Sequence, residues 1–449
     1  MKLDTELILD IGQTNIKLYY INSKNFNVIK SFNIKNNFIE KKKKYFFFNH
    51  NKLKNRIFKI LIDNSKLYNV NNISCVSFGS TAFYIDKNLK ILPAPTFNNI
   101  SNNKIDNIYN KNLPKFSNSL TPKMEKFHNM GKQILLMNEI YKKEKIAGLI
   151  NLPNLINFYL NNNKGFDLNY LACHSHLFNF KTKKLSSLCD YLDISKYLNN
   201  LNKPFEISEN KITSSNISHF LNKSVKVRFG CHDTNSSYFF HKNMFSQKID
   251  VVCTGTWFVL MSESYPVSKI QNNNNSFGNY SLNNKILPSF RFPGGIEYMN
   301  ILNNINNSKL SLDIKIDYLK LEKILKDYFN QIKIYKKINY NKYDLKTLKI
   351  ITLFKIAVYT SRYLTKLNSK SSLIIDGFFA KNNLFLYFLT MLRKRQKIYS
   401  YIGPNSCVDG FLFYINKNKI KDRYIMHKYN DYSEIDIIFK LQKMINNKF

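Results

Sequence analysis

Short apolar runs separated by polar turns predict a hairpin at the start of the chain. Residues 7–9 are apolar, residues 10–15 form the polar segment Asp-Ile-Gly-Gln-Thr-Asn, and residues 16–21 are apolar and aromatic. Two such runs joined by a turn that contains glycine are typical of a β-hairpin. Residues 27–34 predict a third strand. Further along, residues 73–79 read as a buried strand and residues 82–86 as its continuation, whereas residues 35–55 read as an exposed loop followed by the start of a helix.

The same pattern returns in the second half of the chain. Residues 250–253 are apolar, Thr-Gly-Thr follows, and residues 257–262 are apolar again, so that Gly255 lies 243 residues after Gly12. A second pair of segments, 74–86 and 373–381, supports the correspondence. A spacing this large does not fit a solenoid and favours two diverged copies of one unit. Helical periodicity predicts helices at 55–68, 132–142, 152–160, 352–366, 383–393 and 433–447, and mostly helix over 309–345.

These patterns predict an α/β fold of two similar domains, residues 1–224 and 225–449. The chain has 449 residues, of which 44% are apolar and 22% charged, which excludes a largely disordered chain or a fibre. The sequence contains no uninterrupted apolar stretch of about 18 residues, so it predicts no membrane-spanning helix. The six cysteines are scattered without a CxxC pair, so we expect reduced thiols in a cytoplasmic protein and no zinc site.

The net charge of +38 suggests nucleic-acid binding at first sight. Only seven of the 68 basic residues are arginine, however, and Asn, Ile, Phe and Tyr are also abundant. A base bias toward A/T-rich codons explains all of these residues together, and recognition surfaces favour the bidentate arginine. We therefore expect no specific nucleic-acid partner, while a basic nucleic-acid-binding protein stays open as an alternative.

The two turns carry residues suited to phosphate. Glycine allows close backbone approach, and Thr, Asn and Gln add donors beside turn amides that can cradle anions. A carboxylate at the end of a strand can hold Mg²⁺. The first turn offers Asp10, Gly12, Gln13, Thr14 and Asn15, with Lys17 nearby, and the second offers Thr254, Gly255 and Thr256. Two ordinary hairpins that use turn-forming residues are the alternative reading.

A third polar turn, Gly-Cys-His-Asp-Thr-Asn at 230–235, follows a short strand predicted at 225–229. Asp233 at its end is a candidate general base, since phosphoryl transfer to a hydroxyl needs a group that accepts the proton. The alternative is that Asp233 caps the helix that follows.

Taken in order, the segments DIGQTNIK, GCHDTN, CTGTW and DGFFAKN resemble the motif series of the FGGY carbohydrate kinases. FGSTAFYID with LPAP, LACHSHLFNFKTKKLS and ILPSFRFPGGIEY are similar to further stretches of that family, the last two to one branch related to fuculokinase, rhamnulokinase and xylulokinase. The resemblance covers residues 6 to 412. It implies two actin-like, ribonuclease-H-like domains that flank a cleft for ATP and sugar.

The resemblance also implies roles for individual residues. Asp233 would be the catalytic base and would touch the sugar, and Asp10 would act at Mg²⁺. The first turn and Lys17, together with the second turn, would hold ATP phosphates. The remaining positions fall into two groups: a nucleotide motif at Asp376, Gly377, Phe378, Phe379 and Asn382, and sugar contacts at Gly79, Ser80, His174 and His232.

The expected activity is ATP-dependent, Mg²⁺-dependent phosphorylation of a small sugar: a ketopentose, a deoxyketohexose or a related polyol. We expect a monomer or homodimer without a membrane partner. The chain departs from the branch at Phe178, Asn179, Ile296 and Phe378, which leaves sugar selectivity and ATP affinity open. A decayed sugar-kinase homologue with a regulatory role, or another actin-superfamily ATPase, are the alternatives.

Overall fold

The computed structural model describes residues 2–209, 212–221, 224–303, 343–419 and 423–427, together with 321, 323–325 and 327. The chain divides into two compact units. Unit 1 comprises Met1–Met244, Val267–Pro288 and Pro404–Lys421, and unit 2 comprises Phe245–Pro266, Ser289–Gly403 and Asp422–Phe449. Each unit is built on a mixed β-sheet with helices, so the predicted α/β fold of two similar domains is confirmed.

The sheet of unit 1 begins with the predicted hairpin. β1 and β2 are antiparallel, with Ile11 opposite Ile16 and the polar turn between them. β6 pairs with β1 in parallel, so the carboxyl ends of the two strands lie at the same edge. The strand order is β11-β12-β6-β1-β2-β3, and β13 also pairs with β6. The strands of this sheet are β1 (Leu3–Ile11), β2 (Asn15–Asn22), β3 (Val28–Lys35), β6 (Tyr68–Ser77), β11 (Ile207–Glu209), β12 (Lys226–Arg228) and β13 (Cys231–His232).

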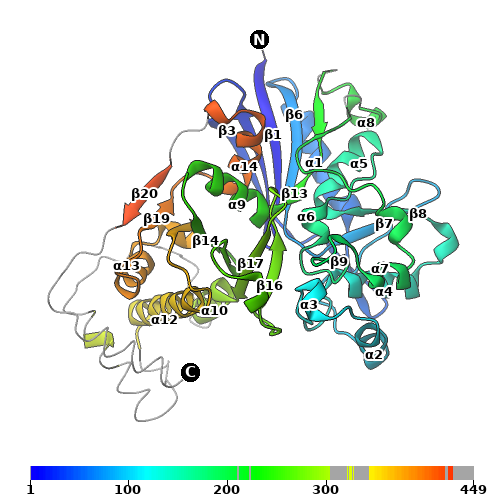
Figure 1. Ribbon diagram of the computed structural model, residues 1–449. Coiled ribbons are helices and arrows are strands. Elements are labelled where there is room, and N and C mark those ends of the chain that lie inside the picture. The colour runs from blue at the N-terminus through cyan, green and yellow to red at the C-terminus, as the bar shows by residue number, and fades with distance from the viewer. Residues whose placement is uncertain are drawn as a thin grey trace. The chain divides into compact units, whose positions relative to one another are not determined.

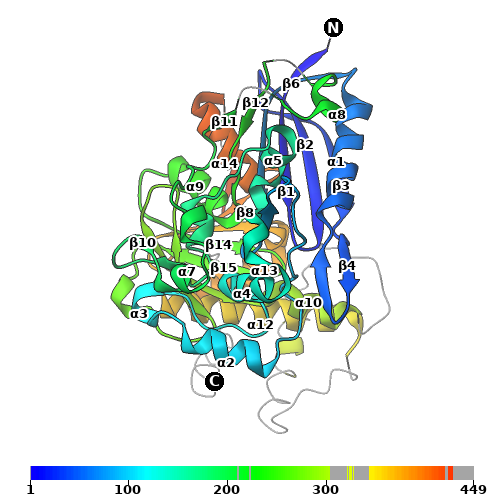
Figure 2. The same cartoon turned by 90° about the vertical axis from the view of Figure 1, so that its right-hand side faces the viewer.

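Alternation along β1 sends side chains to both faces of this sheet, and both faces are covered. Figures 1 and 2 show α9 (Asp233–Met244) and α14 (Ser406–Ile415) on one side and α1 (His50–Asn64) on the other. Ile8 and Val76 from the sheet pack with Val408 and Phe411 of α14 in a buried cluster. The segment 404–421 is therefore an integral part of unit 1.

The rest of unit 1 consists of short elements. Its further strands are β4 (Ile39–Lys42) paired with β5 (Tyr45–Phe48), β7 (Ala82–Asp86) paired with β8 (Ile146–Asn151), β9 (Phe178–Asn179) paired with β10 (Lys184–Leu185), and β16 (Ser276–Tyr280). Its other α-helices are α2 (Asn103–Lys111), α3 (Phe116–Ser119), α4 (Met130–Ile140), α5 (Leu155–Asn161), α6 (Leu168–Leu171), α7 (Ser187–Tyr191) and α8 (Ser215–Ser218).

Unit 2 repeats the strand order of unit 1. β14 and β15 form the second predicted hairpin, β18 pairs with β14 in parallel, and the order continues as β17-β15-β14-β18-β19-β20. The strands are β14 (Ile249–Thr254), β15 (Phe258–Ser262), β17 (Ile286–Phe292), β18 (Ser372–Gly377), β19 (Ile398–Tyr401) and β20 (Tyr424–His427). The helices are α10 (Gly294–Asn303), α12 (Leu345–Lys366) and α13 (Asn383–Leu392).

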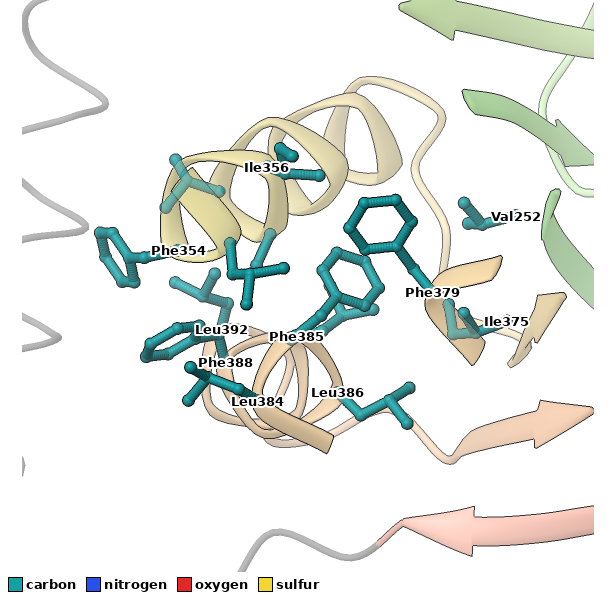
Figure 3. Packing of buried hydrophobic residues seen from close by; sticks show 14 of the residues in the cluster. Val252, Phe354, Ile356, Ile375, Phe379, Leu384, Phe385, Leu386, Phe388 and Leu392 are labelled. Carbon is teal, nitrogen blue, oxygen red and sulfur yellow. The ribbon is translucent and has the colours of Figure 1, made fainter. Parts of the chain in front are cut away.

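The core of unit 2 lies between its sheet and two apolar helices. Figure 3 shows Phe385 of α13 lying toward the strands, whereas Phe354 of α12 and Phe388 of α13 pack between the two helices, away from the strands. Phe379, from the turn after β18, joins the same cluster, and its ring centroid lies 5.4 Å from that of Phe385. Burial of this many aromatic side chains anchors the end of β18.

Several predicted elements are corrected by the structure. Residues 82–86 do not continue the preceding strand but form β7, which pairs with β8 in a separate sheet. In the segment 35–55, predicted as a loop and the start of a helix, α1 does begin at His50, but the predicted loop contains the β4–β5 hairpin. The predicted helix at 433–447, and most of the predicted helical region at 309–345, lie outside the described residues.

The predicted domain boundary between residues 224 and 225 does not coincide with the division of the chain into compact units. Residues 225–244 belong to unit 1, since β13 pairs with β6 and α9 packs against α14. Residues 267–288 and 404–421 also return to unit 1. No helix among the described residues is long and apolar enough to cross a membrane.

Candidate functional site

Asp10 lies at the carboxyl end of β1, opposite Lys17 across the hairpin. Its Oδ2 accepts a hydrogen bond of 2.6 Å from Nδ2 of Asn405, the residue that also caps α14. Burial raises the pKa of Asp10 to about 6, the Asp233 carboxylate adds to the rise, and the Asn405 hydrogen bond and Lys17 oppose it. A cation bound next to this carboxylate would stabilise its ionised form and lower its pKa.

The turn after Asp10 is braced from within the unit. The Gly12 N–H donates to the Asn15 carbonyl at 2.9 Å, and Asn36 Nδ2 donates to the Gly12 carbonyl at 2.7 Å. A Cβ at Gly12 would lie 2.8 Å from the Asn15 oxygen, so the turn requires glycine there. Thr14 and Asn15 are exposed and Gln13 is half-buried, which leaves their side chains accessible to a ligand.

Asp233 is the first residue of α9 and directly follows β13. Its Oδ1 accepts the Thr234 N–H at 2.6 Å and lies 3.4 Å from Nε2 of His232. Burial raises the pKa of Asp233 to about 7 and lowers that of His232 to about 4. The imidazole is therefore neutral near pH 7, and the contact between the two side chains is polar but not an ion pair.

β6 lies between the two carboxylates. Asp10 of β1 and Cys231 of β13 both align with Val76 of β6, from opposite sides, and Asp233 follows two residues later. Neighbouring strands are about 4.8 Å apart, so two strand spacings, roughly 10 Å, separate the backbones of β1 and β13. The structure thus brings Asp10 and Asp233 to one edge of one sheet, close enough for Asp233 to raise the pKa of Asp10.

Two of the predicted sugar contacts, Gly79 and His232, lie next to each other in unit 1. A Cβ at Gly79 would lie 3.0 Å from His232 Nε2, and Cys173 Sγ lies 3.6 Å from the same nitrogen. Ser80 adopts a left-handed backbone conformation, with φ of 64°, and its buried hydroxyl has no hydrogen-bond partner among the described residues. His174 also has a positive φ, and its ring lies 4.3 Å from that of Phe277. Gly79, Ser80, His174 and His232 are therefore all part of unit 1.

In unit 2 the side chain of Thr254 is used within the protein. Its hydroxyl donates to the Asp376 carbonyl and accepts the Phe379 N–H at 2.9 Å, and the residue is buried. This links the end of β14 to the turn after β18. Gly255 and Thr256 are exposed, and a Cβ at Gly255 would meet only the Trp257 carbonyl, at 3.7 Å. The open part of the second turn is therefore Gly255 and Thr256.

The nucleotide motif divides in the same way. Gly377, with φ of 85°, and Phe378 are exposed, and Gly377 aligns with Thr254 across β14 and β18. Asp376 is buried and accepts the Gly377 N–H at 2.7 Å. Phe379 belongs to the hydrophobic core, and the buried Asn382 caps α13 through the Phe385 N–H. Asp376, Phe379 and Asn382 therefore support the edge that Gly377 and Phe378 present.

The four departures from the family pattern have internal partners or lie at the surface. Phe178 packs against Phe180 and Tyr280, and Asn179 accepts two backbone N–H groups of the turn that follows. The Ile296 N–H donates to the Thr256 carbonyl at 3.2 Å, which joins α10 to the second turn. The fourth, Phe378, is 42% exposed.

Sequence reasoning missed two asparagines of this site, Asn36 and Asn405. Asn405 stands directly before an apolar helical run, a pattern that predicts a helix cap. Nothing local indicates that its amide also reaches Asp10, which lies 395 residues away. Asn36 follows an exposed strand and carries no signal of its own.

Comparisons with known proteins match part of the chain to a family. Residues 246–419 match the family described as "Carbohydrate kinase FGGY, C-terminal domain". No curated protein matches the chain significantly. The predicted resemblance to FGGY carbohydrate kinases is thus confirmed over the segment that contains the Thr-Gly-Thr turn and the Asp-Gly-Phe-Phe motif.

Solved structures match the chain over nearly its whole length. A carbohydrate kinase from Novosphingobium aromaticivorans has a TM-score of 0.82 at 15% identity, covering 98% of this chain and 99% of that one. A ligand-bound xylulose kinase from Lactobacillus acidophilus gives 0.75 at 14% identity, covering 99% and 98%. Plasmodium falciparum glycerol kinase with ADP gives 0.72 at 14%, also covering 99% and 98%. The chain therefore has the fold of these sugar kinases.

Proposed function

We propose that this chain, whose residues 246–419 belong to the FGGY carbohydrate kinases, transfers the γ-phosphoryl group of ATP to a hydroxyl of a small sugar or polyol. The observation that carries the proposal is the pair Asp10 and Asp233 at one edge of the unit 1 sheet. Two carboxylates with raised pKa values suit two roles, one at a metal and one at a proton.

Asp233 is the proposed general base. It accepts the proton of the attacking hydroxyl while that oxygen bonds to the γ-phosphorus and the bond to the β-phosphate oxygen breaks. A base works best when its pKa lies near the working pH, and burial raises the pKa of Asp233 to about 7. The Thr234 N–H fixes one carboxylate oxygen at 2.6 Å, and the other oxygen remains to face the substrate.

Asp10 is the proposed carboxylate for Mg²⁺. Oxygen ligands suit this ion, and Asp10 is half-buried, near a second carboxylate, with one oxygen held by Asn405. Asp10 would hold Mg²⁺ together with the phosphates of ATP. The ion supplies neutralisation of phosphate charge.

The exposed turn residues are the proposed phosphate contacts. Thr14 and Asn15 in unit 1 and Thr256 in unit 2 carry hydroxyl and amide side chains at exposed positions, and Gly255 lets a phosphate approach the backbone closely. Gly377 and Phe378 are the proposed nucleotide contacts, with Thr254, Asp376, Phe379 and Asn382 holding that edge in place.

On the sugar side, Ser80 and the imidazole of His232 provide polar groups beside Gly79, and His174 lies one residue from Cys173. Neutral donors and acceptors of this kind suit sugar hydroxyls. A ketopentose, a deoxyketohexose or a related polyol is the proposed substrate class. The xylulose kinase and glycerol kinase folds named above are in keeping with it.

The test is an assay of ADP release from Mg-ATP against a panel of ketoses, deoxyketoses and polyols, with Asp233→Ala measured beside the wild type. We expect release that depends on one class of sugar and falls about 10²–10⁴-fold in the variant. Sugar-dependent release at full rate in Asp233→Ala would remove Asp233 as the base.

Two other outcomes separate the alternatives. ADP release that needs no sugar would indicate an ATPase of the wider actin superfamily. Silence across the panel, with Mg-ATP still raising the melting temperature, would indicate a decayed kinase that binds ligands for regulation.

A further inference from the structure

Asp167 is a buried carboxylate that the proposed reaction does not use. It is connected by hydrogen bonds to the turn at residues 230–235 that carries Asp233, here called the catalytic turn. Asp167 stands just before α6 and has no exposed surface. Two side chains beside it, Asn151 and Asn154, are also fully buried. A buried carboxylate is costly unless hydrogen bonds compensate it, so its partners define what it holds in place.

A chain of three hydrogen bonds runs from the catalytic turn to Asp167. The Gly230 N–H donates to Asn154 Oδ1 at 2.8 Å, Asn154 Nδ2 donates to Asn151 Oδ1 at 2.7 Å, and Asn151 Nδ2 donates to Asp167 Oδ2 at 2.7 Å. A backbone N–H can only donate and a carboxylate oxygen accepts, so the two ends fix the orientation of both amides. Gly230 lies three residues before Asp233.

A second arm starts from the other oxygen of Asp167. Oδ1 accepts the Tyr170 N–H at 2.8 Å. The Tyr170 hydroxyl donates to the Phe78 carbonyl at 2.9 Å and accepts the Thr81 N–H at 3.0 Å, so it spans the Gly79–Ser80 turn. The ring of Tyr170 meets that of His232 edge to face, with centroids 6.1 Å apart.

The catalytic turn has little room to move away from this chain. A Cβ at Gly230 would lie 2.4 Å from the Pro153 carbonyl oxygen and 2.7 Å from that of Cys75. Gly165 is as tight, since a Cβ there would lie 2.8 Å from Asn154 Cγ. Asn154 is thus enclosed, and its amide cannot turn to another partner without disturbing the backbone.

We propose that Asp167 is a positioning residue for Asp233. Through Asn151 and Asn154 it fixes Gly230 at the start of the catalytic turn, and through Tyr170 it fixes Gly79, Ser80 and the ring of His232. The inference rests on the proposed function, because it assumes that Asp233 is the base.

The test compares two buried asparagines at the start of α5. Asn154→Ala cuts the chain between Gly230 and Asp167. Asn157→Ala is the matched control, since Asn157 is equally buried but neither of its amide atoms has a hydrogen-bond partner among the described residues. We expect Asn154→Ala to lower kcat about 10- to 100-fold, the cost of a misplaced catalytic group, with the ATP KM within about twofold of wild type. Asn157→Ala should leave kcat within about twofold.

A double-mutant cycle separates positioning from a structural effect. In an Asp233→Ala background, Asn154→Ala should cost less than about twofold in the remaining rate, since the group that it positions is gone. An equal loss in both backgrounds, or no loss in the single variant, overturns the proposal. If Asn154→Ala does not fold, Asp167→Asn replaces it: the isosteric amide puts an NH₂ group against donors, and the same kcat loss is expected.

The failure of this inference differs from failure of the proposed function. A wild type silent on every sugar contradicts the proposed function, and a fully active Asp233→Ala contradicts the role of Asp233 as its base. An active wild type, an impaired Asp233→Ala and an unimpaired Asn154→Ala contradict only the positioning role.

Discussion

The two units share one strand order but present different chemistry at the matching edge. β11-β12-β6-β1-β2-β3 in unit 1 corresponds to β20-β19-β18-β14-β15-β17 in unit 2, and Gly12 corresponds to Gly255. With that alignment, Cys253 stands where unit 1 has Asp10. Unit 1 presents two carboxylates with raised pKa values, whereas the edge of unit 2 exposes Gly255, Thr256, Gly377 and Phe378.

In the proposed reaction the two copies of the fold would therefore have different tasks. In unit 1 the strand ends carry groups that can hold a cation and accept a proton. In unit 2 the polar side chains at the strand ends, Thr254 and Asp376, make internal hydrogen bonds, and the two glycines, Thr256 and Phe378 are exposed. Such an edge suits contact with a nucleotide through the main chain.

The largest expected effect comes from removing a carboxylate of unit 1. Asp233→Asn keeps the size of the side chain but removes its ability to take a proton, and kcat should fall about 10²–10⁴-fold. Steady-state ADP release with the preferred sugar measures it. The matched change in unit 2, Cys253→Ser at the position of Asp10, should alter kcat less than about twofold. If Cys253→Ser lowered kcat more than Asp10→Asn does, the proposed difference between the two units would be wrong.

A side chain added at a tightly packed glycine of unit 2 should raise the ATP KM without affecting Asp233, the proposed base. A Cβ at Gly295 would lie 2.1 Å from the Gly255 carbonyl oxygen, so Gly295→Ala must displace the second turn. We expect the ATP KM to rise roughly tenfold, about 1.4 kcal/mol, while the sugar KM stays within about twofold. Separate titrations of ATP and sugar give the two constants. A rise in the sugar KM alone would assign this turn to the sugar.

The pH dependence of kcat/KM should be set by a group of unit 1, Asp233. Asp233 must be ionised to act and its pKa is raised to about 7, so kcat/KM should climb about tenfold per pH unit below 7 and level off above it. A profile that is flat from pH 5 to 8 would contradict this assignment.

Stability should show the opposite trend. Because the folded carboxyl has a higher pKa than the unfolded one, stability falls as pH rises from about 4 to about 7, and the penalty is fully present above the folded pKa. Asp233→Asn lacks this group, so its melting temperature should rise relative to wild type over the same window. A difference between the two melting temperatures that does not change with pH would show that the pKa is not raised.

The smallest expected effect compares two helix caps. Asn405 caps α14 and holds Asp10 in unit 1, and Asn382 caps α13 in unit 2. Alanine at either position should cost about 1 kcal/mol of unfolding free energy, measured by urea titration. Only Asn405→Ala should also lower kcat, by several-fold, because it frees the Asp10 carboxylate. Equal kcat values for the two variants would reduce Asn405 to a cap.

The sequence predicted both hairpins and both glycine turns, because a strand–turn–strand unit is specified by neighbouring residues. It also singled out Asp10 and Asp233, each at the end of an apolar run. What it missed depends on contacts between distant segments. The pairing of β13 with β6 brings Asp233 to the same edge of the sheet as Asp10, and β7 pairs with β8 at 60 or more residues along the chain.

Burial was the second limit of sequence reasoning. Thr254 and Phe379 match nucleotide and phosphate motifs, yet the hydroxyl of one and the ring of the other are used inside unit 2. A motif gives the residue type and its place on the chain but does not show which way the side chain turns. The roles of Asn151 and Asn154 could not be predicted either, because asparagine is abundant throughout this chain and these two positions do not stand out.

The division of the chain has a consequence for the order in which the protein is made. The polypeptide passes from one unit to the other after residues 244, 266, 288, 403 and 421, so neither unit is a continuous fragment. During synthesis Asn405, whose amide holds Asp10, is added 395 residues after that carboxylate, and α14 follows it. The carboxylate edge of unit 1 therefore cannot be completed before residues 405–415 have been made.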